Sequence, residues 1–346
     1  MTDAVAGLPV LDIARLDGPP AERAAFLADL RTAARRFGFF YLRGHGIPPQ
    51  AAERVLDAAR LFFALPEAGK LAVEMVNSPH FRGYTRTGFE LTRGQQDWRE
   101  QIDFNSERPR RPSAPADRPW ARLQGPNQWP EALPGLKPVV TDWQERLTAL
   151  GIRVLEAFAL ALGQPRTVFS PIYAHAPNQH VKLIRYPGRG PGTSDQGVGA
   201  HKDSGFLTLL LQDTEPGLEV EIDGAWIAAP PVPGTFIVNI GEILEMASDG
   251  YLKATVHRVV SPAAERERLS VAFFLGADHD AVVPHLTLPP ERAAEAPGAA
   301  QEPDNPLFYE VGRNYLKGRL RSHPDVARRH HADLIEAGAP AAAGVC

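Results

Sequence analysis

The sequence predicts an α+β protein with a mainly β centre, in which helices precede a double-sheet or barrel core. Glycine (30 residues) and proline (33 residues) make up almost a fifth of the 346 residues, which favours turns and strands over a helical bundle. Short apolar segments follow one another after Asn178, and turn dipeptides such as Pro187-Gly188 and Asp223-Gly224 separate them. Before Asn178, apolar residues recur at helical spacing in three long stretches.

The first half of the chain is expected to alternate strands and helices. Residues 8–13 form an opening strand, and a helix over about 21–36 ends at Gly38, ahead of a buried strand at 39–42. Two further helices are expected over about 51–64 and 139–162. The segment 77–134 between them is rich in proline, glycine and arginine and is expected to be irregular.

The second half is expected to hold short strands, then a surface loop at 288–306 and a final helix over about 325–337. The predicted strands are 180–186, 199–203, 207–212, 218–222, 235–240, 255–260 and 269–275. We therefore expect an N-terminal region of residues 1–135. The remainder, 136–346, would contain the long helix, a core at about 178–280 and the C-terminal helix.

Composition excludes several classes of protein. With 37 Lys and Arg against 41 Asp and Glu, the net charge is −4, which argues against nucleic acid or an anionic membrane as the main partner. The only cysteine is Cys346, which excludes disulfide frameworks, cysteine-bound zinc and iron–sulfur clusters. Neither a signal peptide nor a membrane span is visible, so a cytoplasmic location is expected. The oligomeric state is not readable.

The strongest chemical signal is a pair of metal-ligand side chains, His201 and Asp203. Side chains two apart on a strand share a face, so both could reach one ion. A His-x-Asp triplet alone is weak evidence, because two others begin at His323 and His331. Those two lie at a predicted helix start and inside a predicted helix, where side chains two apart diverge.

His257, in another predicted strand, supplies a third ligand. Two histidines and one carboxylate leave metal positions open, which suits non-haem Fe(II). The alternative is that His257 is a half-buried strand histidine bound only to backbone.

Arg268 and Ser270 share a strand face, while Leu269, Val271 and Phe273 point to the other side. An inward arginine needs an anion, and a guanidinium binds a carboxylate through two hydrogen bonds. The alternative is an internal salt bridge. Tyr186 is a further inward residue, for which a plain core role is the alternative.

Taken together, these residues resemble the isopenicillin-N-synthase-like branch of the iron- and 2-oxoglutarate-dependent dioxygenases. The resemblance covers roughly residues 8–275, and the matching motifs occur in the family's order. They are Phe37-Gly-Phe-Phe-Tyr-Leu-Arg-Gly-His-Gly-Ile47, His201-Lys-Asp-Ser-Gly-Phe-Leu-Thr-Leu-Leu-Leu-Gln-Asp213, Asp249-Gly-Tyr-Leu-Lys-Ala-Thr-Val-His-Arg-Val-Val260 and Arg268-x-Ser270. One departure is Ile184-Arg-Tyr-Pro187, where the family often has Asn-Tyr-Tyr-Pro.

The resemblance implies a double-stranded β-helix (jelly roll) with packed N-terminal and flanking helices. It implies Fe(II) held by His201, Asp203 and His257, and 2-oxoglutarate held by Arg268, Ser270 and Tyr186. With O₂ as second cosubstrate, the enzyme would oxidise an unidentified small molecule by hydroxylation, desaturation or ring closure, with release of succinate and CO₂.

Two alternatives stay open at this point. One is an oxidase of the isopenicillin N synthase or ethylene-forming type, which does not consume 2-oxoglutarate in the usual way. The other is a non-catalytic sensor of iron or 2-oxoglutarate.

Four residues are candidates for the substrate pocket. The resemblance places Arg82, Tyr84 and Glu90 near the mouth of the site, although an exposed loop is the alternative. Lys182 shares a strand face with Tyr186, so we expect it to be buried opposite an anion, which the resemblance implies is the cosubstrate or an acidic substrate.

Overall fold

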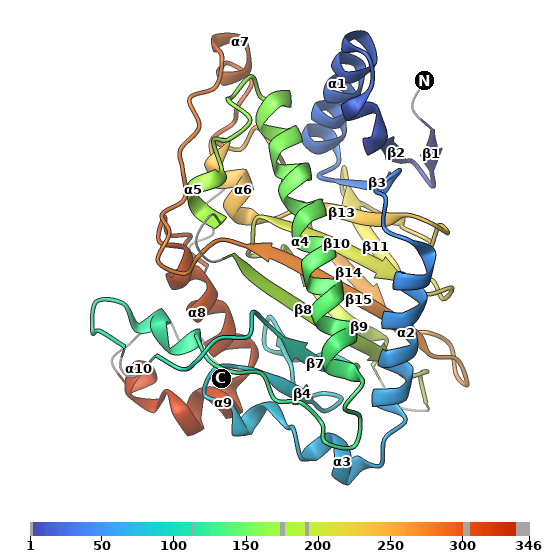
Figure 1. The fold of residues 1–346 in the computed structure, drawn as a ribbon, viewed down its shortest axis with the longest axis vertical. Coiled ribbons are helices and arrows are strands. Elements are labelled where there is room, and N and C mark those ends of the chain that lie inside the picture. Colours follow the sequence, from blue (N-terminus) through green and yellow to red (C-terminus); the bar gives the residue numbers. More distant parts are fainter. Residues whose placement is uncertain (1–2, 112–113, 174–176, 191–193, 300–304, 337–346) are drawn as a thin grey trace.

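Figure 1 shows a computed structural model of the chain, which describes residues 3–111, 114–173, 177–190, 194–299 and 305–336. Its centre consists of a large and a small β-sheet. In spatial order, the large sheet holds β1 (Ala4–Val5), β2 (Leu8–Asp12), β3 (Phe39–Arg43), β13 (Phe236–Ile240), β10 (Leu207–Gln212), β15 (Arg268–Gly276), β8 (Asn178–Tyr186), β7 (Glu100–Phe104) and β4 (Gly83–Thr85). The small sheet holds β12 (Ala225–Ala228), β11 (Leu218–Ile222), β14 (His257–Val260) and β9 (Gln196–His201).

Most of the pairing is antiparallel, and only β2 and β3 run parallel among the strands that the structure describes. A separate hairpin consists of β5 (Leu91–Thr92) and β6 (Gln95–Gln96). The α-helices are α1 (Pro20–Arg36), α2 (Pro49–Phe63), α3 (Glu67–Leu71), α4 (Leu136–Ala161), α5 (Ser170–Tyr173), α6 (Glu242–Ala247), α7 (Pro290–Ala293), α8 (Val311–Ser322), α9 (Pro324–His330) and α10 (Ala332–Glu336). Three 3₁₀ helices span Ile13–Asp17, Met75–Asn77 and Pro119–Leu123. Across the described ranges, no helix combines the length and the apolar character that crossing a membrane requires.

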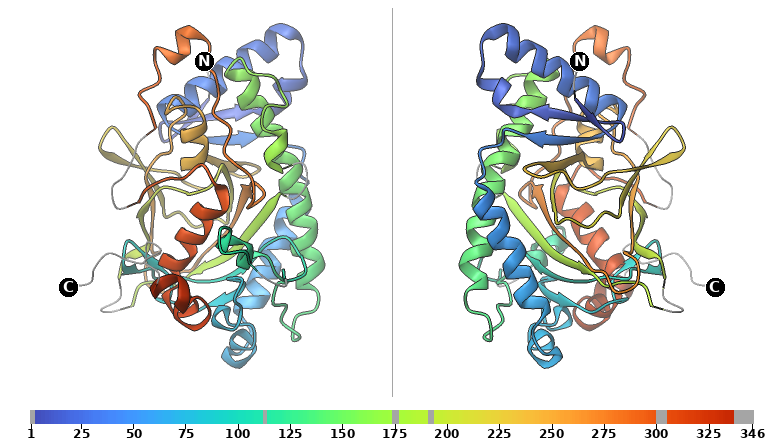
Figure 2. Two further views of the ribbon diagram at one scale, coloured as in Figure 1. Left: turned by 90° about the vertical axis from the view of Figure 1, so that its left-hand side faces the viewer. Right: turned by 90° about the vertical axis from the view of Figure 1, so that its right-hand side faces the viewer.

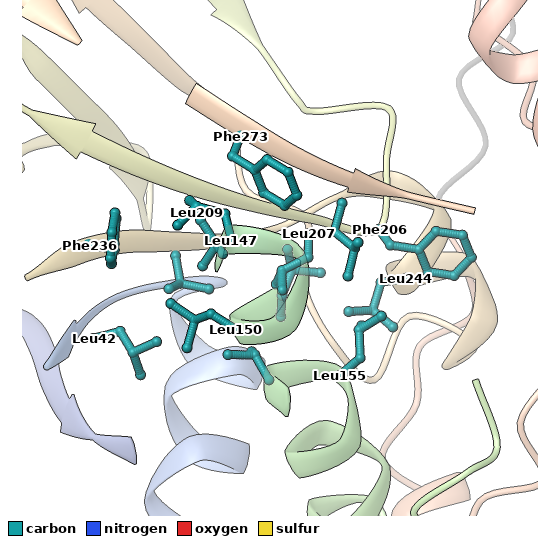
Figure 3. Packing of buried hydrophobic residues seen from close by; sticks show 14 of the residues in the cluster. Leu42, Leu147, Leu150, Leu155, Phe206, Leu207, Leu209, Phe236, Leu244 and Phe273 are labelled. Atoms are coloured by element: carbon teal, nitrogen blue, oxygen red, sulfur yellow. The ribbon is translucent and has the colours of Figure 1, made fainter. Parts of the chain in front are cut away.

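Helices cover one face of the large sheet and form the main hydrophobic core there. Figures 1 and 2 show α2 and α4 lying across the strands on this side. In the close view of Figure 3, Leu147, Leu150 and Leu155 of α4 face leucine and phenylalanine side chains of the sheet. The ring of Trp143 lies 5.9 Å from that of Phe236. This core fixes the large sheet as a rigid base.

The other face of the large sheet looks toward the small sheet. A second core joins the two, with Ile184, Tyr186 and Ala272 from the large sheet against Val198 and Val259 from the small one. Strand alternation explains the division, because Leu183 and Val271, next to Ile184 and Ala272, belong to the helix-side core. Side chains between the sheets are therefore the ones that can line an internal site.

Some sequence-based expectations about this fold are wrong, among them the loop at 288–306, which contains the short helix α7. The segment 77–134 is not irregular throughout, because β7 lies inside it, with all five of its residues buried. Its Glu-Gln-Ile-Asp-Phe sequence is too polar to stand out as a buried strand, yet it pairs with β8 over five residues. The expected helix at 325–337 is broken into α9 and α10 near His331, and α8 precedes it. Residue 337 itself lies outside the described residues.

The position of Gly38 should not tolerate a side chain, because its φ is +65° and a Cβ there would lie 2.1 Å from the carbonyl oxygen of Lys253. Gly38→Ala should lower the free energy of unfolding in urea by about 3 kcal/mol, the upper end for point mutations. Gly46→Ala is the matched control, because φ is +76° there but the added Cβ meets nothing within 4 Å. Its cost should stay near 1 kcal/mol, about that of the left-handed backbone alone. Equal losses in the two variants would contradict the steric argument.

Candidate metal and cosubstrate site

Two histidines of the small sheet meet across a strand pair. His201 is the last residue of β9, His257 is the first of β14, and the register places them opposite each other. Their ring centroids are 4.3 Å apart. The antiparallel pairing of these two short strands therefore brings together residues that are far apart in the sequence.

Asp203 joins them from outside the strand, which corrects the expected strand at 199–203. β9 ends at His201, so strand alternation does not explain how Asp203 reaches the same point. The large sheet holds it instead: Thr208 of β10 and Asn239 of β13 both donate hydrogen bonds to Asp203 Oδ2. The other carboxylate oxygen, Oδ1, is left facing the histidines.

Three free ligand atoms converge at this point. Asp203 Oδ1 lies 3.5 Å from His201 Nε2 and 3.7 Å from His257 Nε2. The opposite ring nitrogens are engaged, His201 Nδ1 with the carbonyl of Gly199 at 2.8 Å and His257 Nδ1 with that of Thr255 at 3.2 Å. Such contacts fix the tautomer that leaves the Nε2 lone pair free for a metal. Within the described ranges, this is the only group of three His, Cys, Asp or Glu side chains that could hold one ion.

The electrostatics of Asp203 and His257 suit metal binding. Burial lowers the pKa of His201, but the neighbouring Asp203 outweighs it and raises that pKa. Burial raises the pKa of Asp203, but the nearby His257 and His201 outweigh it and hold the pKa well below its usual range. Burial, and next the charge of His201, lower the pKa of His257 to about 4. At neutral pH the carboxylate is thus ionised and the His257 ring neutral, the forms in which both bind metals.

Arg268 lies deep between the sheets and has no ion pair with any acid that the structure describes. Its side chain is 0% exposed, and Nη2 donates to Gln212 Oε1 at 2.8 Å. Arg268 Nε and Nη1 and the Ser270 hydroxyl are buried with no hydrogen-bond partner among the described residues, and no described acid lies within ion-pair distance of Arg268. The internal salt bridge that we considered is therefore absent from the described structure. A buried cation with free donors fits a bound carboxylate.

The strand register assembles the surroundings of Arg268. Arg268 on β15 is opposite Tyr186 on β8, and its guanidinium carbon lies 4.9 Å from the centre of the Tyr186 ring. Ser270 stands opposite Gln212 on the other neighbouring strand, β10. Leu269, Val271 and Phe273 belong to the helix-side core, as strand alternation predicts.

The four candidate pocket residues do not share one place. Lys182 is buried as expected, but its anion is Glu90, whose Oε1 lies 2.8 Å from Lys182 Nζ. Arg82 is also buried and donates to backbone carbonyls. The expectation that Tyr84 lies near the mouth of the site is wrong. Tyr84 packs against Phe62 of α2 and belongs to the helix-side core, on the face of the sheet away from the histidines. Opposite Ile102 in the strand pair, it shares that residue's face.

Sequence reasoning missed the residues that orient the candidate ligands. Thr208, Asn239 and Gln212 each contact Asp203 or Arg268. A usable signal was present, because Thr208 and Gln212 interrupt the apolar run Leu-Thr-Leu-Leu-Leu-Gln at even spacing. Polar residues on one face of an otherwise apolar strand indicate that this face lines an internal site.

Two family models match the chain. Residues 8–132 match the model described as non-haem dioxygenase in morphine synthesis N-terminal. Residues 177–277 match that of the 2OG-Fe(II) oxygenase superfamily. Together the matches span well over half of the chain and include the two histidines, Asp203 and Arg268.

Curated relatives agree with these matches. The chain is 34% identical over 339 residues to the 2-oxoglutarate-dependent dioxygenase frbJ of Dothideomycetidae sp., covering 93% of this chain and 91% of the relative. It is 35% identical over 308 residues to a homoarginine-6-hydroxylase of Arabidopsis thaliana, covering 85% and 92%.

Solved structures show the same likeness. A 2OG-Fe(II) oxygenase family protein from Caulobacter crescentus has a TM-score of 0.72 at 29% identity, covering 91% of this chain and 99% of that chain. A full-length protein of Neurospora crassa, solved in complex with alpha-KG, has a TM-score of 0.70 at 26% identity, covering 90% and 95%.

These matches confirm the resemblance seen in the sequence. The protein is an oxidoreductase whose cofactors are Fe(II) and 2-oxoglutarate, and it oxidises a small molecule. The three converging metal-ligand atoms and the unpartnered nitrogens of the buried Arg268 agree with these matches. The chain belongs to the 2OG-Fe(II) oxygenase superfamily.

Proposed function

We propose that His201 Nε2, Asp203 Oδ1 and His257 Nε2 hold the Fe(II) of this oxygenase. The observation that carries the assignment is the convergence of these three free atoms while their partner atoms are all hydrogen-bonded. Three protein ligands leave other positions on the metal open, as a cosubstrate and O₂ require.

Arg268 and Ser270 would hold the distal carboxylate of 2-oxoglutarate, and Tyr186 would support the guanidinium from one side. The unpartnered Nε and Nη1 of Arg268 and the Ser270 hydroxyl supply three donors. Gln212 fixes the orientation of the guanidinium through Nη2. When bound, the iron and 2-oxoglutarate supply the oxidising chemistry, with release of succinate and CO₂. The protein binds and orients the reactants and excludes water from a buried site.

We infer that the two facing sheets are the halves of a double-stranded β-helix. The core that both sheets share supports this topology. Residues 1–135 would be the N-terminal dioxygenase-type region, although β2 and β3 extend the large sheet through β13. The expectations of a cytoplasmic location and of no nucleic-acid or membrane partner stay predictions.

A first experiment tests the iron ligands. His257→Ala should abolish binding of one Fe(II) per chain, measured by anaerobic titration with a chelator competition assay, because three ligands become two. His285→Ala, at an exposed position, is the matched control and should bind iron normally. Normal iron binding by the His257 variant would refute the assignment.

A second experiment tests Arg268. Arg268→Lys keeps the positive charge but loses the planar guanidinium, which can bind a carboxylate through two hydrogen bonds. The affinity for 2-oxoglutarate should therefore fall by about 1–3 kcal/mol, roughly fivefold to 150-fold. The measurement is anaerobic titration of the Fe(II) protein, followed through the visible absorption of the chelate. Arg185→Lys is the control, because Arg185 pairs with Glu100 and Glu267 on the opposite face of β8. If the unsubstituted protein shows no absorption band with 2-oxoglutarate and releases no succinate, the result would point instead to an oxidase of the isopenicillin N synthase type.

The substrate itself calls for a screen scored by succinate release. We propose to begin with compounds named in the relatives, homoarginine and 1-aminocyclopropane-1-carboxylate, because the buried charges Glu90, Asp103 and Lys182 would suit a small charged molecule. Thymine, which occupies one solved structure of the same fold, is an uncharged comparison. We expect a charged compound to raise succinate release several-fold above the substrate-free rate. Equal stimulation by thymine would contradict this preference for charge.

A further inference from the structure

Helix α8 presents polar side chains to the interior at a spacing of four residues. Tyr315, Arg319 and, just past its end, His323 share one side of the helix. The Tyr315 hydroxyl is buried against the backbone of Gly276, at the end of β15, and lies 3.4 Å from the position of a Cβ on Gly205. Gly205 is two residues from Asp203, so this side of α8 lies near the proposed iron ligands.

The Arg319 guanidinium shares its acceptors with other buried groups, and its Nη1 also lies 3.4 Å from His323 Nε2. Its Nη1 donates to Asp103 Oδ1 at 3.1 Å, an oxygen that also lies 2.7 Å from His180 Nε2 and 3.9 Å from Lys182 Nζ. Its Nη2 lies 2.8 Å from the same His180 Nε2. Burial and the charge of Arg319 lower the pKa of His180 to about 3, so the ring is neutral. One neutral ring nitrogen cannot both donate to Asp103 and accept from Arg319, so one of these contacts is unsatisfied.

Arg82 adds a second buried cation with no acid of its own. It donates to the carbonyl oxygens of His80 and Leu123, its Nε is unpartnered, and no described carboxylate lies within ion-pair distance. Burial, and next the charge of Arg319, lower the pKa of Arg82 to about 9, which still leaves it charged at neutral pH. The two arginines therefore repel each other in a poorly solvated place.

Counting the buried charges around these residues shows what is missing. The buried cations are Arg82, Arg99 and Lys182, and Arg319 beside them is half-buried, with a side chain 12% exposed. The carboxylates are Glu90, Asp97 and Asp103. His323 is neutral, because burial lowers its pKa to about 4. Fe(II) with Asp203, and doubly charged 2-oxoglutarate with Arg268, would carry no net charge. The four cations therefore exceed the three carboxylates by one positive charge, which the carboxylate of a ligand would compensate.

We propose that Arg319 of α8, assisted by Arg82 and the Tyr315 hydroxyl, binds a carboxylate group of the primary substrate, so that the enzyme selects small carboxylic acids. The inference rests on the proposed function, because Arg319 meets a substrate only if iron and 2-oxoglutarate occupy the neighbouring candidate site. It assigns α8 to substrate recognition and leaves Arg268 to the cosubstrate.

The test compares acids with their amides. The full chain is held anaerobically with Fe(II) and saturating 2-oxoglutarate, and thermal unfolding is measured with a panel of aliphatic, aromatic and amino carboxylic acids, each paired with its carboxamide. We expect at least one acid to raise the unfolding temperature where its amide does not. If no acid stabilises the protein more than its amide, the proposal is overturned.

Variants of α8 assign the effect to Arg319. Arg319→Gln should raise the Kd of the selected acid by about tenfold to a hundredfold, the usual effect of losing a charge-assisted hydrogen bond. Arg319→Lys keeps the cation and should lose less, which also covers the case in which the glutamine variant fails to fold. Arg313→Gln, on the exposed side of the same helix, is the control and should bind the acid normally. Unchanged acid affinity in both Arg319 variants would overturn the proposal.

The same samples separate this inference from the proposed function. The visible absorption of the Fe(II)–2-oxoglutarate chelate is recorded before each acid is added. A missing band would count against the assignment of the iron and cosubstrate residues. A normal band without preference for acids would count against Arg319 alone.

Discussion

The carboxylate of Asp203 ties the two sheets together, and the candidate site depends on that connection. One oxygen accepts hydrogen bonds from Thr208 and Asn239 of the large sheet, and the other faces the two histidines of the small sheet. A shift of one sheet relative to the other would separate the ligands. The helix-side core resists such a shift, because it packs α4 against β10 and β13, the strands that carry Thr208 and Asn239. Precision at the site thus comes from apolar packing on the opposite face of the sheet.

The interior between the sheets is costly for the protein when it holds no ligand. Arg268 and Ser270 both bury polar atoms without partners among the described residues. Each such atom costs about 1–3 kcal/mol relative to a satisfied one. Groups of this kind persist where a ligand completes them, so binding of the cosubstrate should also stabilise the fold.

Much of the fold could be predicted from the sequence because local pattern determined it, whereas the site residues were expected mainly from the order of the family motifs. The strands at 207–212 and 218–222 have the predicted bounds, and Arg268 faces the interior as alternation requires. The failures have a common physical cause. Strand β7 and helix α8 bury polar side chains such as Asp103 and Asn314, so hydrophobic periodicity does not mark them. The position of Asp203 could not be predicted for a different reason. It lies outside the strand, and tertiary hydrogen bonds, which sequence spacing does not predict, hold it in place.

The class of reaction is easier to read than the substrate because different parts of the chain determine them. The candidate iron and cosubstrate residues lie within 177–277, where strand register fixes their relative positions and where the superfamily model matches. The inward-facing α8 residues Tyr315 and Arg319 lie outside both matched segments. A helix added after the last strand can change its inward residues without disturbing the register that holds the metal ligands. Selectivity can therefore diverge through this helix while the oxidising centre stays the same, and for that reason its charges are the place to look for the substrate.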